Sequence, residues 1–88
     1  MARIEFLDVE GLLREVVPNA DMFFKLGMMY SVGHAVPADL VSAHKWFNIA
    51  AIHGNTDAVR LRCEIATEMS ETEVAAAQRA ARDWVRRH

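Results

Sequence analysis

The chain has 88 residues, of which 52% are hydrophobic and 25% charged, a composition that predicts one small globular domain and excludes a disordered chain. Its formal net charge of −2 gives no general attraction to nucleic acid or to anionic membranes. No apolar run approaches the about 18 residues of a membrane span, and the first residues lack the apolar core of a secretory signal, so we expect a cytoplasmic protein with no membrane association.

The N-terminal segment, residues 1–18, is predicted to contain an amphipathic helix over residues 6–17. Its apolar positions recur at helical spacing: Leu7, Leu12, Leu13 and Val16. Pro18 is expected to end this helix, because the residue before a proline avoids the α region.

The next helix is predicted to run to about Val32, with Asn19 or Asp21 as its N-cap, because both side chains accept backbone hydrogen bonds well. Its apolar residues lie on several faces: Met22, Phe23, Phe24, Leu26, Met28, Met29, Tyr30 and Val32. A helix that is apolar nearly all round has to be covered on several sides, and another chain is one candidate for that cover.

Gly27 lies inside this helix, where glycine costs about 1 kcal/mol relative to alanine. We therefore expect another helix to approach closely at Gly27, which has no Cβ. The small residues expected to face it lie on the following helix: Ala43, Ala50 and Ala51. Gly33 is expected to end the helix in the left-handed conformation.

Three more helices are predicted along the chain. The first begins after Asp39, its N-cap, and its core stripe consists of Leu40, Ala43, Phe47 and Ala50. The second follows Asn55 and runs to about Met69, with an apolar stripe of Ala58, Leu61, Ile65 and Met69. The last follows a capping box at Ser70 and Glu73, and its inward residues are Val74, Ala77, Ala81 and either Trp84 or Val85.

Residues 22–54 also contain glycines, alanines and aromatics in a characteristic order: Leu26, Gly27, Tyr30, Gly33, Val36, Pro37, Asp39, Ala43, Trp46, Ala50, Ala51 and Gly54. Together they resemble one complete Sel-like (Sel-one) repeat, a bacterial and eukaryotic relative of the tetratricopeptide repeats. Met22 and Ala35 depart from the family pattern, which usually has alanine and glycine there. Ala35 resists the positive φ that glycine permits.

The resemblance implies an all-α fold of antiparallel helical hairpins of the tetratricopeptide or Sel-like type, with about four to five short helices. The whole chain would be a single domain, in which residues 19–54 form the repeat hairpin. Residues 55–88 would form a degenerate repeat, a capping helix pair, because the pattern fades after residue 54.

Sel-like repeats usually bind proteins, so the resemblance implies a small non-catalytic adaptor or regulator. The family's first helix generally lines the binding surface, and the residues expected to contact a partner are Phe23, Lys25, Met28 and Val32. The other interpretation is that Phe23 and Met28 pack beneath the N-terminal segment. One hairpin with few covering elements favours a homodimer, because about three repeats are usually needed for independent stability.

No pattern of reactive residues predicts an enzyme, a cofactor or a metal. His34, His44 and His53 lack the i, i+4 spacing of a helical zinc motif and are expected at the surface or at helix ends. Cys63, the single cysteine, is expected to be a small buried residue in a protein of a reducing compartment.

A basic face is predicted on the last helix, where Arg79, Arg82 and Arg86 recur at i, i+3 and i+7. Arginines in a final helical turn suit the helix dipole, so a solvated face is the simplest interpretation. Two alternatives remain open for this face, an acidic protein surface and, less favoured, a nucleic acid. No aromatic residues interleave with the arginines as base-stacking platforms.

Overall fold

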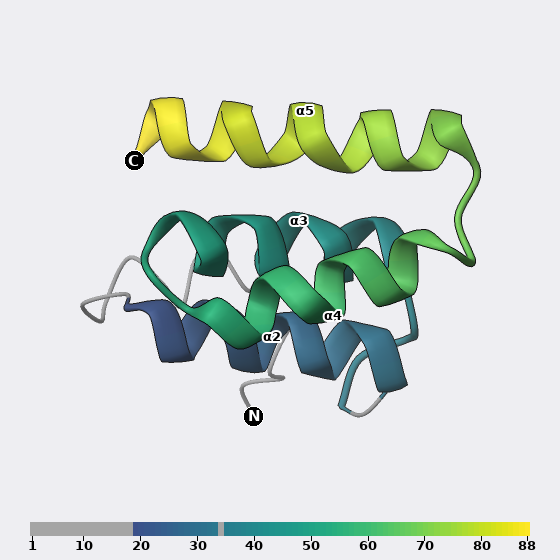
Figure 1. Cartoon of the computed structure of the whole chain (residues 1–88), viewed down its shortest axis with the longest axis horizontal. Coiled ribbons are helices and arrows are strands. Elements are labelled where there is room, and N and C mark those ends of the chain that lie inside the picture. Colours follow the sequence, from purple (N-terminus) through teal and green to yellow (C-terminus); the bar gives the residue numbers. More distant parts are fainter. Residues whose placement is uncertain (1–18, 34) are drawn as a thin grey trace, which may run out of the picture.

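The computed structural model of the chain describes residues 19–33 and 35–88. Within them the fold is all-α, with four helices and no strand, and this confirms the predicted class (Figure 1). The helices are α2 (Ala20–Val32), α3 (Leu40–Ile52), α4 (Thr56–Ala66) and α5 (Glu71–Arg87). The helix expected over residues 6–17 and the loop residue His34 lie outside the described residues.

Each helix begins at a side chain that caps it, as the sequence predicts. Of the two candidates for α2, Asn19 is the cap, and its Oδ1 accepts a hydrogen bond from the Met22 amide at 2.9 Å. At α5 both bonds of the capping box form, one of 2.8 Å from the Ser70 amide to Glu73 Oε1 and one of 3.1 Å back to the Ser70 hydroxyl. The remaining caps are Asp39 for α3 and Asn55 for α4.

Helix α4 ends at Ala66, three residues before the expected end at Met69. Residues 67–69 continue in tighter turns, in which each backbone N–H bonds to the carbonyl three residues earlier. The Thr67 hydroxyl also donates to the carbonyl of Glu64 at 2.7 Å. This local bond competes with helical pairing and accounts for the early end.

Helix α3 is the central element, and α2, α4 and α5 each pack against it. In Figure 1, α5 runs along the top, with α3 beneath it and α2 lower still. The three contacts use three faces of α3. Phe47 meets Phe24 of α2, Trp46 meets Trp84 of α5, and Asn48 bonds to Arg62 of α4.

The core is larger on α3 than the predicted stripe, because three helices cover it. Ala43, Phe47 and Ala50 of that stripe are buried, whereas Leu40 is half-buried. The additional buried side chains of α3 are His44, Trp46 and Ile49. On α5, Trp84 points inward and Val85 is exposed, which decides between the two alternatives.

The loop between α2 and α3 contains two residues with positive φ. Gly33 ends α2 at φ 73°, as predicted. Ala35 has φ 74° in spite of its Cβ, a conformation that costs a non-glycine residue roughly 1–2 kcal/mol. The loop is held by the buried Val36 and by a 2.9 Å bond from the Asp39 amide to the carbonyl of Tyr30.

Candidate functional site

The inner face of α2 packs against α3 through Phe23, Gly27 and Tyr30, which recur at i, i+4 and i+7. A Cβ added at Gly27 would lie 2.5 Å from two carbons of the Phe47 ring. This confirms the close approach expected at Gly27. The facing group is nevertheless the flat ring of Phe47, and not the alanines that the sequence suggested.

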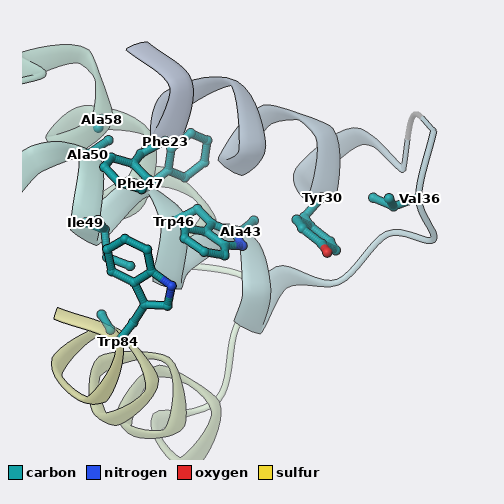
Figure 2. Packing of buried hydrophobic residues seen from close by; sticks show 11 residues of the cluster. Phe23, Tyr30, Val36, Ala43, Trp46, Phe47, Ile49, Ala50, Ala58 and Trp84 are labelled. Carbon is teal, nitrogen blue, oxygen red and sulfur yellow. The ribbon is translucent and has the colours of Figure 1, made fainter. Parts of the chain in front are cut away.

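Phe23 was expected to contact a partner, and the structure corrects this, because its side chain is 0% exposed. Its ring stacks on Trp46 at 6.0 Å between centroids and makes a T-shaped contact with Trp84 at 5.2 Å. His53 covers it from a third direction at 4.9 Å. Figure 2 shows Trp84 of α5 reaching the end of the α2–α3 hairpin that carries Phe23. The chain's own last helix therefore supplies the cover that we had assigned to a partner.

The outer face of α2, formed by Lys25, Met28 and Val32, is exposed along its length. The three residues lie at i, i+3 and i+7, so they share one side of the helix, opposite Phe23. Val32 is 64% exposed and Met28 37%. Three of the four residues expected to bind a partner are therefore brought together at the surface.

A hollow of about 380 Å³ adjoins the outer face of α2 at the start of the helix. It is lined by Asn19, Asp21, Met22, Lys25 and Leu26. Lys25 thus belongs both to the hollow and to the outer face. This concave region combines two apolar side chains with an amide, a carboxylate and a cation, so it can accept a side chain of another protein that is apolar with a polar end.

The basic face of α5 is exposed, because Ala77, Ala81 and Trp84 turn the opposite side of the helix toward α3. Arg86 pairs with Asp83 at 3.0 Å, and both side chains are more than half exposed, so this ion pair contributes about 0–1 kcal/mol. The alternative of a nucleic-acid surface rests on the exposed arginines alone: Arg79, Arg82 and Arg86.

Two further sequence expectations are wrong. His44 is buried inside α3, where we expected surface or helix-end histidines, because it lies one turn before Asn48 on the face that α4 covers. Cys63, expected in the core, is exposed. It occupies the outer side of α4, whose fully buried residue is Ala58.

Residues 19–33 and 35–88 contain neither a cluster of metal ligands nor a membrane-spanning helix. No group of three or more His, Cys, Asp or Glu side chains in this part of the chain can hold a metal ion. None of its helices is long and apolar enough to cross a membrane.

Comparison of the chain with protein-family models, with curated proteins and with solved structures gives no match in any of the three. The class defined by the fold is therefore a small all-α protein with an exposed, partly apolar face on α2. The resemblance of residues 22–54 to a Sel-like repeat remains a proposal.

Proposed function

We propose that this protein is a non-catalytic interaction module, an adaptor or regulator, that binds another protein or a second copy of itself through the outer face of α2. The observation that carries the proposal is the exposure of Met28 and Val32 on a helix whose other side is fully packed. Covering the exposed two-thirds of the Val32 side chain contributes about 1 kcal/mol to association.

The chemistry of the outer face suits an adaptable protein contact. Met28 has an unbranched, polarisable side chain that fits apolar partners of different shapes. Lys25 adds a long apolar stem and a charge that favours a partner with an acidic group at its rim.

The resemblance to Sel-like repeats supports the same proposal, because several residues of the pattern have the structural roles that a helical hairpin needs. Gly27 admits Phe47, Gly33 ends α2, and Asp39 caps α3. The buried members of the pattern on α3 are Ala43, Trp46 and Ala50. Hairpins of this kind present one helix face to proteins, as α2 does in this proposal.

We assign the protein to the cytoplasm. Cys63 is the only cysteine of the chain, and its thiol is exposed. A reducing compartment keeps such a thiol from forming disulfides between molecules.

A photo-crosslinking residue at position 32 tests the proposed face, with position 59 as the matched control. Val32 and Val59 are both exposed valines, on α2 and α4 respectively. We expect discrete protein adducts from position 32 and few from position 59. Adducts of the purified protein would show binding to a second copy, and adducts formed in cells would show binding to another protein. Equal labelling at both positions would contradict a specific face on α2.

The partner identified in this way then allows an affinity measurement. Val32→Glu is expected to weaken binding by about tenfold, since a charge would replace an apolar contact. Val59→Glu is expected to leave the affinity unchanged. A Val32→Glu protein that binds as tightly as the parent, with an unchanged melting temperature, refutes the assignment of this face.

A further inference from the structure

His44 is a buried polar side chain with an unsatisfied nitrogen. The residue is 2% exposed, and its Nδ1 has no hydrogen-bond partner. Buried polar groups are nearly always paired, because a group that loses its water partners on folding and gains no other is destabilising. The unpaired nitrogen of His44 therefore destabilises the packing around this residue.

The charged group that faces His44 is Arg62, across the α3–α4 interface. The guanidinium of Arg62 donates a 2.7 Å hydrogen bond to Asn48 Oδ1, one turn along α3 from His44. Burial, and then the positive charge of Arg62, lower the pKa of His44 below its ordinary value of 6.5 and outweigh a contact with its own backbone, which raises that pKa. A proton on His44 would place a buried cation beside the half-buried guanidinium of Arg62.

The other charged side chains of α2 and α5, the remaining helices packed on α3, are exposed to solvent. They are Asp21 and Lys25 of α2 and all the charged residues of α5. Lys45, the next residue along α3, lies with its Nζ 4.4 Å from the centroid of the Trp46 ring. Of the carboxylates on α2, α4 and α5, none is buried in this interface to neutralise a charged imidazole.

The remaining charged side chains of α4 form ion pairs within that helix and do not hold α4 against α3. Arg60 pairs within α4 with Asp57 at 3.8 Å and with Glu64 at 3.2 Å, at the surface. Toward the core, α4 has one fully buried residue, Ala58, whereas Leu61 and Ile65 are half-buried. Elements with few buried apolar contacts open first, so α4 can leave α3 while the rest of the core stays intact.

We infer that α4 is a pH-dependent cover of α3: proton uptake by His44 releases α4 and exposes the α3 face that carries His44, Asn48 and Ala51. This device is independent of the proposed partner face on α2. The closed form holds His44 neutral, so closure is favoured above about pH 6.5 and is lost as the pH falls below it. Between the two pKa values of His44, the opening equilibrium grows by up to about tenfold per pH unit.

Energy transfer between tryptophan and a label on Cys63 measures this opening. Cys63 is the single cysteine and lies exposed on α4, while both tryptophans, Trp46 and Trp84, lie in the core shared by α2, α3 and α5. An AEDANS group on Cys63 accepts their emission. Between pH 7.5 and pH 5 we expect the transfer to fall, while the tryptophan emission maximum stays at its buried position.

Three variants separate the proposal from general acid unfolding. His44→Gln is expected to abolish the fall in transfer, and His53→Gln to retain it. Arg62→Gln removes the cation but keeps an amide that can bond to Asn48, so its fall should be smaller than in the parent. This third variant also decides the question if His44→Gln does not fold.

Three outcomes would overturn the inference. One is transfer that stays constant down to pH 5. Another is a fall in transfer that coincides with a red shift of the tryptophan emission, because the whole core would then be opening. The last is a fall that persists unchanged in both His44→Gln and Arg62→Gln.

Discussion

The α2–α3 hairpin and α4 were both predicted from apolar residues at helical spacing, yet they are held in different ways. In the hairpin, Phe23 and Phe47 are fully buried between helices. In α4 the small residue Ala58 reaches that depth, and Leu61 is half-buried. The difference shows that periodicity identifies the inward side of a helix but not how deeply that side is covered.

The side chains between α2 and α3 are deeply buried because α5 covers them. Its Trp84 packs in T-shaped contacts against Phe23, at 5.2 Å between ring centroids, and against Trp46, at 5.6 Å, so one side chain of α5 contacts both α2 and α3. No comparable aromatic residue belongs to α4. The two regions should therefore respond very differently to truncation of a single side chain.

Phe23→Ala is expected to destabilise the protein by about 3–5 kcal/mol, because it removes a fully buried ring from the aromatic cluster. Domains of this size are stable by roughly 4–13 kcal/mol, so this loss removes between about a quarter and all of the free energy of unfolding. Urea unfolding followed by tryptophan fluorescence measures the loss.

Leu61→Ala on α4 is the matched comparison for Phe23→Ala. Its expected cost is about 1–2 kcal/mol, since only part of that side chain leaves water on folding. Equal losses in the two variants would mean that α4 is as firmly held as the hairpin. If Phe23→Ala instead keeps the stability of the parent and weakens self-association, Phe23 contacts a partner and is not part of the core.

Gly27→Leu tests the closest point of the hairpin. The ring of Phe47 occupies the space that any side chain at position 27 needs, so we expect a loss of about 1–3 kcal/mol. Thermal unfolding measures it, with Lys25→Leu on the exposed side of the same helix as the control. Lys25→Leu should change stability by no more than about 0.5 kcal/mol. A melting temperature unaffected by Gly27→Leu would show that α2 and α3 are not in tight contact there.

Ala35→Gly is a smaller and opposite change, in the loop that joins the two halves of the hairpin. Glycine adopts φ 74° without strain but gains freedom in the unfolded chain, so the net stabilisation should be about 0.5–1 kcal/mol. Ala38→Gly, at an exposed position without positive φ, should be neutral or slightly destabilising. If both glycines destabilise equally, the loop does not strain Ala35.

The parts of the fold that the sequence predicted depend on local chemistry. Asp39, Asn55 and Ser70 cap helices because each bonds to a backbone amide three residues on, and Gly33 ends α2 because of its own φ. These features need no knowledge of which helices meet. The all-α class and nearly all the boundaries of the four described helices were predicted from these local features.

The errors concern burial, which depends on distant parts of the chain. His44 was predicted to be exposed and is buried, whereas Cys63 was predicted to be buried and is exposed. Both errors arise because one side of α4 packs on α3 and the other side faces solvent. For Phe23 a usable signal was present: it lies one turn before Gly27, which was already assigned to a close helix contact. Extending that contact by one turn would have separated Phe23 from the outer face of α2.

The position of Trp84 has a consequence for how the protein is made. Ribosomes release Phe23 and Trp46 early and Trp84 late, and at about 5–20 residues per second the interval lasts a few seconds. During that interval the nascent hairpin exposes aromatic rings that have no cover in its own sequence. Translational pausing or early termination before Trp84 should therefore produce aggregation-prone chains, even though both helices of the hairpin have already been synthesised.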